Sequence, residues 1–585
     1  MNMPAAGPNR KAAINWEVLT LEEALESLDP FASELSVDVL ICVSHKCRKR
    51  RDLAKAHQLL GFVSRNGLET QGPLGNHLVP MLVECGSIAS AREIFERSIY
   101  PNVHAWTSLI SGYVQGGFYK HAWNLYRRMQ ASCVCINSYT LVALLKASLN
   151  LKEVQEAHLE IVEKGFENDL FVGSTLVDSY VKCGGLSEAH GVFSQMPVRS
   201  VVSWTALIAG YADNGLSEEA VDCYEQMQKQ GFLPNEVTLI CILKACATLR
   251  ALVKGEEVHT DICQKGYCNP LLESTLVDMY AKCGSHLEAY AVLKKLSVQD
   301  VVAWNALIAG YVEYELGQEA LTCFEQMQDG DVPVDAFTAV CVLKACGDTG
   351  ASDKGFDVHT EIILKSFESD PFVGNTLVDM YGKCGLLVEA RKVFDGLEVK
   401  DLVSWNAMLR GYGANYEGTK TLQLFECMQE HGMKPDAMTF TSVLSACSHV
   451  NCAQRGLDLF KLMSIDYAII PTIDHFTCVV DLLARSGQLH EAEKLLGSMT
   501  GAQSKEMWLA LLSACKSCSE LDLGLNCFQH LIKIDPECST PYMLMANMYA
   551  NAGRWQEACK IEDFQRKICS EMGASCEFHS LVMNK

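Results

Sequence analysis

A repeat close to 100 residues long is the feature of this sequence that most constrains its fold. Four tryptophans are separated by 98, 100 and 101 residues, namely Trp106, Trp204, Trp304 and Trp405. A Gly-Tyr pair follows each tryptophan at the same distance, and a Cys-Gly pair keeps the same period. A single helical hairpin repeat takes about 30 to 50 residues. The period must therefore be a composite of several hairpins.

The composite divides into three parts, 201–235, 236–269 and 270–300, of which the first has 35 residues and the last 31. In the first part, apolar residues follow a helical spacing from Trp204 to Tyr211, and Asp213-Asn214-Gly215 interrupts that spacing before it resumes at Ala220. Each part therefore predicts a helical hairpin. Because one hairpin cannot bury its hydrophobic face alone, the sequence predicts an all-α fold, a right-handed α-solenoid of stacked helical hairpins.

The composition restricts the classes of protein that this chain can belong to. The chain has 585 residues and a formal charge of −22, which argues against nonspecific adhesion to nucleic acid but permits a local basic groove. Its 27 cysteines are odd in number and recur at fixed places in the repeat, so we interpret them as reduced core residues. No apolar stretch is long enough to span a bilayer, and we expect no membrane partner.

Three segments carry a resemblance to a known family. They are Val-Val-Ser-Trp-Thr-Ala-Leu-Ile-Ala-Gly-Tyr (201–211), Ile-Leu-Lys-Ala-Cys (242–246) and Leu-Val-Asp-Met-Tyr-Ala-Lys-Cys-Gly (276–284). With repeats of 35, about 35 and 31 residues in strict order, the chain resembles the pentatricopeptide repeat family in its plant-type PLS subclass. We call these the 35-residue, the long-type and the short repeats. The Trp-x-x-Leu-Gly-x-x-Tyr pattern of tetratricopeptide repeats is absent.

The resemblance implies an organisation for the whole chain. A possible N-terminal cap (1–36) precedes a degenerate long-type repeat (37–71) and an array of PLS-type repeats (72–505). Trp508 to Cys515 and Leu544 to Glu557 resemble the two hairpins of the extension called the E domain, which we place at 506–572 before a short tail at 573–585.

The resemblance also implies a binding mode, in which about one base of single-stranded RNA is read per repeat. By resemblance, the reading side chains are the fifth and the last residue of a repeat. The pairs are Asn76 and Asn102, Thr107 and Asn137, Ser174 and Ser200, Thr205 and Asn235, Ser274 and Asp300, Asn305 and Asp335, Asn375 and Asp401, and Asn406 and Asp436.

The long-type repeats have aliphatic residues at the fifth position, namely Val142, Ile240 and Val340, so we expect them to act as spacers. The code of the family then implies the RNA 5′-C-A-n-(A or G)-A-n-G-U-n-U-U-3′. Cys478 departs from a reading type in the last short repeat. The alternative explanation for the polar pairs is that they are ordinary helix N-caps.

Six lysines recur on the predicted helix that carries the reading residues. Phosphate contact is one interpretation and a solvated helix face is the other, since Asp178, Asp278 and Asp379 lie near the same face. The lysines are Lys146, Lys182, Lys244, Lys282, Lys344 and Lys383.

No catalytic, metal or cofactor site is predicted, and we expect no enzymatic activity. His158-Leu-Glu160 and His359-Thr-Glu361 match only the first half of the zinc-deaminase signature, which also needs Pro-Cys-x-x-Cys. Both recur at one place in the long-type repeats, so we interpret them as structural. Cys515-Lys-Ser-Cys518 lacks the proline and stands alone.

The resemblance implies a site-recognition factor for organellar C-to-U RNA editing, whose extension recruits a deaminase on another chain. The alternatives are a factor for RNA stabilisation, splicing or processing, and a protein–protein scaffold that binds no RNA. The family is found in the mitochondrion or the chloroplast. Residues 1–40 hold only Arg10 and Lys11 against seven acidic residues, which is a poor match to a transit peptide.

Overall fold

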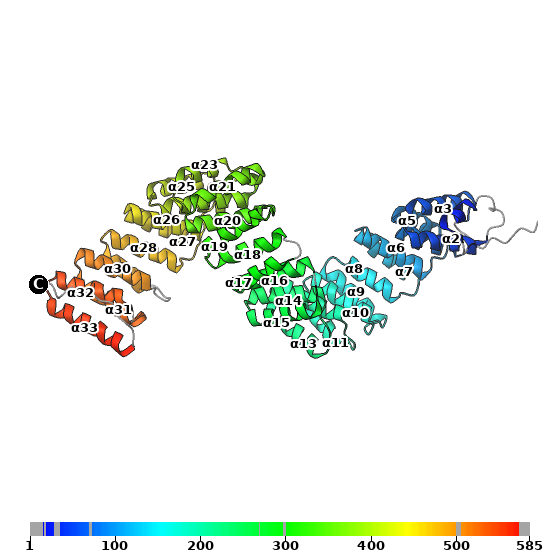
Figure 1. Cartoon of the computed structure of the whole chain (residues 1–585), viewed down its shortest axis with the longest axis horizontal. Helices are drawn as coiled ribbons and strands as arrows, with labels where there is room; N and C mark the ends of the chain where they lie inside the picture. The colour runs from blue at the N-terminus through cyan, green and yellow to red at the C-terminus, as the bar shows by residue number, and fades with distance from the viewer. Residues whose placement is uncertain are drawn as a thin grey trace, which may run out of the picture. The chain divides into compact units, whose positions relative to one another are not determined.

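The computed structural model consists of α-helices arranged in antiparallel pairs (Figure 1). It describes residues 16, 19–28, 36–68, 73–267, 269–296, 300–498, 505–536 and 538–572. The predicted tail and most of the predicted N-terminal segment lie outside the described residues. The all-α solenoid of stacked hairpins predicted from the sequence is confirmed.

The first helices of the successive pairs, some of which carry predicted reading positions, follow one another along the chain. They are α2 (Val37–Arg50), α4 (Leu74–Glu84), α6 (Val103–Gln115), α8 (Ser138–Ala147), α10 (Leu170–Lys182), α12 (Val201–Asp213), α14 (Glu236–Leu249), α16 (Pro270–Lys282), α18 (Val301–Glu313), α20 (Ala336–Thr349), α22 (Pro371–Lys383), α24 (Leu402–Ala414), α26 (Ala437–Val450), α28 (Ile473–Arg485), α30 (Lys505–Cys518) and α32 (Ser539–Asn551).

The second helices return the chain to the start of the next pair. They are α3 (Leu53–Arg65), α5 (Ile88–Arg97), α7 (Tyr119–Ala131), α9 (Leu151–Glu163), α11 (Leu186–Gln195), α13 (Ser217–Lys229), α15 (Leu252–Lys265), α17 (His286–Lys295), α19 (Gly317–Asp329), α21 (Ser352–Leu364), α23 (Leu387–Gly396), α25 (Gly418–Glu430), α27 (Ala453–Ile465), α29 (Leu489–Ser498), α31 (Leu521–Ile534) and α33 (Trp555–Met572). The short helix α1 (Leu21–Glu26) packs on α2, and the 3-10 helix η2 (Phe367–Ser369) precedes α22.

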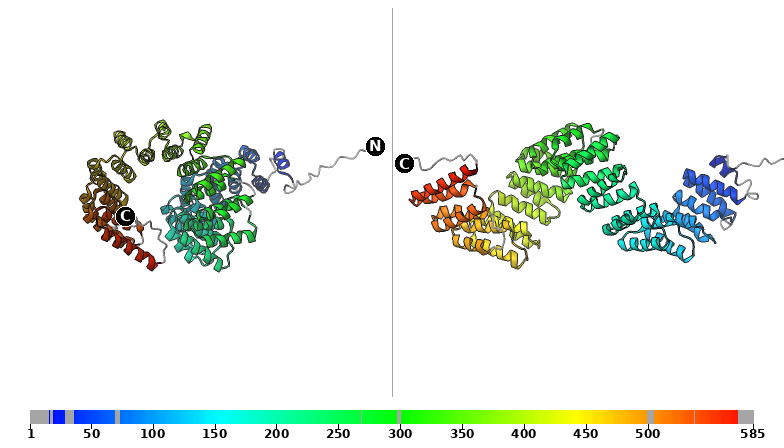
Figure 2. Two further views of the ribbon diagram at one scale, coloured as in Figure 1. Left: turned by 60° about the vertical axis from the view of Figure 1, so that its left-hand side comes forward. Right: turned by 90° about the horizontal axis from the view of Figure 1, so that it is seen from below.

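The chain divides into two compact halves, Met1–Ser285 and His286–Lys585. Within each half, each first helix packs against the first helix of the next pair, and the second helix packs on its own partner and on the next first helix (Figures 1 and 2). In the first half, for example, α13 contacts both α12 and α14. The core of each half is thus a continuous layer between neighbouring hairpins.

The repeated tryptophans fill the space between one hairpin and the next. Trp204 is buried and meets Phe193 of α11 edge to face, with ring centroids 4.6 Å apart. The glycines of three Gly-Tyr pairs, Gly112, Gly210 and Gly411, permit close helix contact. A Cβ on Gly210 would lie 2.6 Å from the side chain of Val181, so no larger residue fits there without a shift. These contacts explain why Trp and Gly-Tyr repeat together.

The described cysteines are free thiols, but only some of them are core residues, since Cys133, Cys135, Cys263 and Cys518 are exposed. Cys47, Cys246 and Cys346 are buried in first helices. Burial raises the pKa of the Cys346 thiol to about 12, so this group stays protonated at neutral pH. In the Cys-x-x-Cys sequence, Cys515 is buried while Cys518 is exposed, so the two thiols lie in different environments.

The histidines of the long-type repeats connect one hairpin to the next. The ring of His158 in α9 lies 2.9 Å from the Tyr180 hydroxyl of α10, and His359 of α21 lies 2.8 Å from the hydroxyl of Tyr381 in α22. The nearby Glu160 accepts hydrogen bonds from Tyr126 and Gln130. Among the described residues no cluster of three or more histidine, cysteine or acidic side chains could hold a metal ion. These contacts support the structural interpretation of the His-x-Glu sequences.

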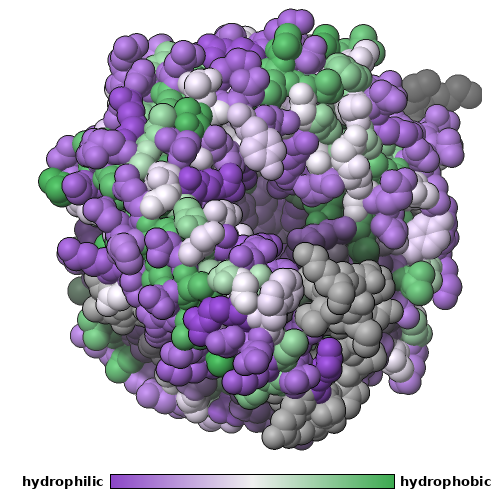
Figure 3. All heavy atoms as spheres, turned by 90° about the vertical axis from the view of Figure 1, so that its left-hand side faces the viewer, coloured by the Kyte–Doolittle hydropathy of each residue, from purple (hydrophilic) through white to green (hydrophobic). Residues whose placement is uncertain are grey.

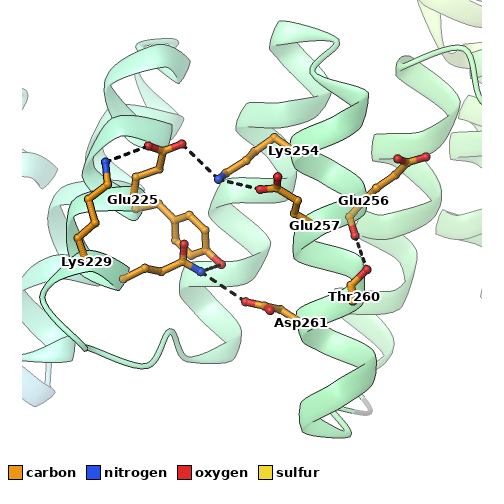
Figure 4. A network of polar contacts seen from close by, with 9 residues as sticks. Glu225, Lys229, Lys254, Glu256, Glu257, Thr260 and Asp261 are labelled. Atoms are coloured by element: carbon orange, nitrogen blue, oxygen red, sulfur yellow. Dashed lines mark hydrogen bonds and ion pairs between the residues drawn. The ribbon is translucent and has the colours of Figure 1, made fainter.

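Ion pairs join the second helices of adjacent repeats. In Figure 4, Glu225 of α13 accepts hydrogen bonds from Lys229 and, at 3.2 Å, from Lys254 of α15, while Lys254 also pairs with Glu257. At the equivalent positions of the later composite repeats, Glu325 forms an ion pair with Lys354, and Glu426 forms one with Arg455. In the earliest composite the charges are reversed, because Arg127 pairs with Glu156 at 3.2 Å.

The predicted extension forms two further helix pairs, α30 with α31 and α32 with α33. The indole of Trp508 stacks on His530 with ring centroids 4.3 Å apart. On the face shown in Figure 3, hydrophobic residues lie scattered among hydrophilic ones. Of the helices described, none combines the length and the hydrophobicity that crossing a bilayer requires.

Candidate nucleic-acid interface

The predicted last residues of the repeats are the N-caps of the following first helices. Asn235 caps α14 by accepting a hydrogen bond from the Thr238 backbone N–H at 2.9 Å. Asn102, Asn137, Ser200, Asp300, Asp335, Asp401 and Asp436 cap their helices in the same way. The alternative explanation, that these residues are helix N-caps, is therefore correct for the last residues of the repeats. It does not account for the further contacts that their side chains make.

The caps of the Asn-Asp pairs also contact the predicted fifth residue of the preceding repeat. The Asn305 side-chain amide donates to the Asp335 carboxylate at 3.1 Å, and Asn406 donates to Asp436 at the same distance. Asn375 donates to Asp401, again at 3.1 Å. In three successive reading repeats, an amide and a carboxylate thus share one site between adjacent first helices.

The other pairs are also brought together, with one exception. The Asn102 backbone N–H donates to the Asn76 side-chain oxygen at 2.8 Å, and the hydroxyls of Ser174 and Ser200 lie 3.3 Å apart. Thr107 and Thr205 reach Asn137 and Asn235 through a bridging hydroxyl, from Thr140 and Thr238 respectively. Ser274 and Asp300 lie in different halves, so their pairing stays a prediction.

The fifth residues have little exposed surface. Asn305 is 6% exposed and Asn375 is 7% exposed. The Oδ1 atom of Asn375 is buried and has no hydrogen-bond partner in the part of the chain that the structure describes. Burial alone would raise the pKa of Asp401, but hydrogen bonds from Ser404 and Asn375 outweigh it and lower that pKa below its ordinary value. The Asp401 carboxylate is therefore ionised at neutral pH and can only accept hydrogen bonds.

An exposed apolar side chain stands at the second position of most first helices, and the sequence analysis did not single it out. Phe372 is 78% exposed and lies three residues before Asn375, so the two share one helix face. The equivalent residues are Tyr139, Phe171, Val202, Val237, Leu271, Val302, Phe337, Val403 and Met438. We call this set the apolar stripe. Each residue of the apolar stripe lies three positions before the fifth residue of its repeat, and this constant spacing is the sequence signal that could have identified the stripe.

The structure changes the register of the last array repeats. Thr477 stands five residues after the N-cap Thr472, as Asn375 stands after Asp370, so Thr477 occupies the fifth position and Cys478 does not. Thr441 takes the same place after Asp436, where the other long-type repeats have an aliphatic residue. Its hydroxyl contacts His475 at 3.3 Å.

The six lysines fall into two groups. Lys182 pairs with Asp178 at 2.6 Å, Lys282 with Asp278 at 2.9 Å, and Lys383 with Asp348 at 2.6 Å. In contrast, Lys146, Lys244 and Lys344 are exposed and make no ion pair with any described residue. The second group is the better supply of positive charge for a polyanion.

A pocket of about 510 Å³ brings several of these features together in the first half. Thr107 and Asn137 line it together with Tyr139 of the apolar stripe and with Lys146. Its polar lining also includes His104 and the ion pair of Arg48 with Glu84. The pocket therefore joins a pair of base-reading type, an exposed aromatic ring and an unpaired cation.

Comparison with family models identifies repeats across most of the chain. The PPR repeat family model matches residues 101–150, 199–248, 299–348 and 400–449, and a PPR repeat model matches 174–201, 274–301, 375–402, 438–465 and 474–503. The E motif model matches residues 518–568.

Curated relatives and solved structures agree with this assignment. The chloroplastic pentatricopeptide repeat-containing protein DOT4 of Arabidopsis thaliana is 35% identical over 525 residues, which are 89% of this chain and 60% of that protein. A mitochondrial family member from A. thaliana is 34% identical over 495 residues, 84% of this chain and 72% of that protein. The chain thus spans about 60% of the length of DOT4.

The crystal structure of the pentatricopeptide repeat protein PPR10 from maize has the same fold. It matches with a TM-score of 0.58 at 17% identity and covers 94% of this chain and 93% of its own. The structure of PPR10 in complex with an 18-nt psaJ RNA element matches with a TM-score of 0.51 at 16% identity, covering 94% of this chain and 95% of its own.

Proposed function

The chain belongs to the pentatricopeptide repeat family and carries an E motif, and we propose that it binds single-stranded RNA in a sequence-specific manner. The observation that carries this proposal is the phased contact between the fifth residue of a repeat and the N-cap of the next. Asn305 with Asp335, Asn375 with Asp401 and Asn406 with Asp436 form the same site at each recurrence.

The hydrogen-bonding groups at an Asn-Asp site match the edge of uracil. The Asp401 carboxylate can only accept, and it suits the N3–H of uracil, whereas cytosine would place an acceptor there. The asparagine keeps a second amide hydrogen that can be donated to a uracil carbonyl. Preference for U over C at these repeats therefore follows from the chemistry of the side chains.

The Thr-Asn sites have the opposite pattern. The Thr238 backbone N–H and hydroxyl both donate to Oδ1 of Asn235, each at 2.9 Å, which leaves the Asn235 amide nitrogen as a free donor. Thr205 gives its only hydrogen to the Val201 carbonyl or to Thr238, both at 2.7 Å, so it faces a ligand as an acceptor. A donor beside an acceptor suits adenine, which offers an acceptor at N1 and a donor at N6.

The surroundings of these sites suit a single strand of RNA. Bases stack favourably on exposed aromatic and apolar side chains, and the apolar stripe supplies one of them a helical turn before six of the eight fifth-position reading residues, Ser174, Thr205, Ser274, Asn305, Asn375 and Asn406. Lys146, Lys244 and Lys344 provide positive charge without a described ion-pair partner on α8, α14 and α20, the helices that the reading residues Asn137, Asn235 and Asp335 cap. A local interface of this kind accommodates a polyanion although the whole chain carries a charge of −22.

We further propose a role in selecting editing sites in an organelle, with the E motif recruiting a deaminase from another chain. The E motif at 518–568 supports this proposal, and the chloroplastic and mitochondrial names of the relatives support organellar residence. Stabilisation or processing of RNA requires the array alone, so loss of residues 506–572 should separate the two roles.

Selection of RNA from a random pool tests the proposed function. We expect enrichment of the register 5′-C-A-n-(A or G)-A-n-G-U-n-U-U-3′, with uracil strongest at the positions of the three Asn-Asp sites. An enriched motif in another register would reject the assigned reading residues. Absence of any enrichment, together with capture of a peptide ligand by the same surface, would favour the scaffold.

A further inference from the structure

A fully buried threonine occupies the third position of the first helix in four long-type repeats. The residues are Thr140, Thr238, Thr338 and Thr439, each with 0% of its surface exposed. Each hydroxyl lies against the fifth residue of the preceding 35-residue repeat. The distances are 2.7 Å to Thr107, 2.7 Å to Thr205, 2.6 Å to Asn305 and 2.6 Å to Asn406.

The first helices that follow short repeats lack this contact. Their third residues are Ala105, Ser203, Ala303 and Ser404. Among the described residues, the Ser404 hydroxyl makes hydrogen bonds only with its own cap, Asp401: it accepts from the Asp401 N–H at 3.1 Å and donates to the Asp401 carboxylate at 2.8 Å. As a result, Oδ1 of Asn375 has no partner among the described residues, although Asn305 and Asn406 have one in the same position.

We propose that the long-type repeats, whose own fifth residue is aliphatic in three cases, contribute to base selection by positioning the reading residue of the repeat before them. The inference rests on the proposed function and deepens it. Thr140, Thr238, Thr338 and Thr439 are positioning residues, because they touch the reading residue and are themselves buried away from any ligand.

The hydrogen bonds of Asn305 show how the positioning works. Its Nδ2 donates to Asp335, and its Oδ1 accepts from the Thr338 hydroxyl. The Thr338 hydroxyl also lies 2.8 Å from the Asp335 carboxylate, so its single hydrogen can go to either oxygen. Exchanging the two ends of the amide would bring Oδ1 against the Asp335 carboxylate, with no hydrogen between the two acceptors, and would force the Thr338 hydroxyl to turn its hydrogen away from Asn305. The amide therefore keeps one orientation and presents its remaining hydrogen as a donor. At Asn375, only the bond to Asp401 opposes that exchange.

The composite repeat therefore contains two kinds of reading site. Sites in 35-residue repeats are held by a threonine from the next hairpin, and sites in short repeats are not. We expect the held sites to discriminate more sharply between bases that differ in donor and acceptor pattern, since an amide that can turn over fits both U and C.

The substitution Thr338→Val tests this inference in the full-length chain, because it removes the hydroxyl and keeps the shape of the side chain. Synthetic RNAs of the expected register are varied at the eighth base, which Asn305 and Asp335 would read, and at the tenth, which Asn375 and Asp401 would read. We expect the preference for U over C at the eighth base to fall roughly three- to tenfold, the range for one neutral hydrogen bond. The preference at the tenth base should stay unchanged.

Ser404→Ala is the matched control, since it removes the same contacts to the N-cap that Thr338→Val removes but no contact to a fifth-position residue. It should leave the preference at the tenth base unchanged, whereas Thr338→Ser should restore discrimination at the eighth. If Ser404→Ala reduced the preference for U at the tenth base as much as Thr338→Val reduces it at the eighth, the effect would come from helix capping and the inference would be wrong. The inference would also be wrong if Thr338→Val left the preference for U at the eighth base unchanged.

Failure of the proposed function gives a different result, because the unaltered chain would then show no preference for uracil at either base. If Thr338→Val does not fold, Thr439→Val makes the same comparison at the eleventh base, which Asn406 and Asp436 would read.

Discussion

The Asn305 amide donates a hydrogen bond of 3.1 Å to the Asp335 carboxylate, although the two residues are 30 positions apart in the sequence. One stands on α18 and the other caps α20, so the contact exists only when the two first helices pack in the correct register. A reading site in this chain is therefore a property of two adjacent hairpins. Its specificity should respond to changes on either one.

Changing both members of one site should change the base that it selects. Asn375→Thr with Asp401→Asn replaces a donor beside a carboxylate with the Thr-Asn pattern, and it should move the preference at the tenth base from U to A. Binding to RNAs that differ only at this base measures the change. The eleventh base, which Asn406 and Asp436 would read, should still prefer U, and an unchanged tenth base would refute the role of this site.

The caps should contribute to stability independently of RNA. The Asp436 side chain accepts from the Thr439 backbone N–H at 2.8 Å, and Asp436→Ala should destabilise its hairpin by about 1 kcal/mol. Asp436→Asn should preserve most of that stability, since asparagine caps equally well. Hydrogen exchange at the start of α26 measures the effect locally. Glu430→Ala, which removes an exposed carboxyl from α25, is the control and should have little effect.

The two groups of lysines should differ in their effect on RNA affinity. Replacing Lys146, Lys244 and Lys344 by glutamine should reduce the slope of log affinity against log salt by about 0.7 for each phosphate that these lysines neutralise. The same replacement of Lys182, Lys282 and Lys383 should change the slope less, because these ammonium groups are already paired with aspartates. Affinity titrations at several salt concentrations measure both slopes, and equal slopes for the two sets would contradict the distinction.

The half-buried histidines of the long-type repeats should make the array less stable in mild acid. Burial lowers the pKa of His359 below its ordinary value, so the unfolded chain binds the proton more tightly than the folded one. The stabilisation is complete above the unfolded pKa of about 6.5 and is lost as the pH falls through the folded value. Melting temperatures at about pH 7.5 and 5.5 measure the loss. His359→Gln should reduce this pH dependence, and a difference as large as in the unaltered chain would exclude His359 as its source.

The ion pairs between second helices should tolerate exchange of their charges only in part. The paired variant Glu225→Arg with Lys254→Glu reproduces the arrangement of Arg127 and Glu156, and it should recover part of the stability that either single change loses. The rest should stay lost, because Lys229 and Glu257 then face side chains of their own charge. Either single change should cost about 0.2 to 1 kcal/mol, the range for exposed pairs. Chemical denaturation of the four chains gives the coupling energy. A coupling energy of zero would mean that this contact has no energetic role.

Much of the fold could be predicted from the sequence because the repeat imposes the same packing several times. The tryptophan spacing located every composite period, and helical spacing in 201–235 predicted a hairpin that the structure confirms as α12 and α13. The caps were also visible, since Asn, Asp and Ser at a helix start have a specific physical role.

Other features depend on contacts between hairpins and were not predictable in this way. The bridging role of Thr338 requires its hydroxyl to meet Asn305 from the preceding repeat, which no local pattern shows. Large apolar side chains such as Phe372 would ordinarily be assigned to the core from their chemistry alone, yet Phe372 is 78% exposed. The one-residue error at Cys478 arose because its repeat lacks a polar pair to fix the register, whereas the Thr472 cap fixes it in the structure.

The residues that precede the first helices both cap a helix and are proposed to read a base, and this combination limits how such a protein can change its RNA target. A position that must accept a backbone N–H admits little beyond Ser, Thr, Asn and Asp without loss of stability. The set of side chains available for distinguishing nucleobases at this position is therefore limited by the requirements of helix formation, independently of RNA. Replacing Asp436 by asparagine keeps a capping side chain at the start of α26. An arginine or glutamine in its place could contact other base edges, but it would destabilise the helix that carries it.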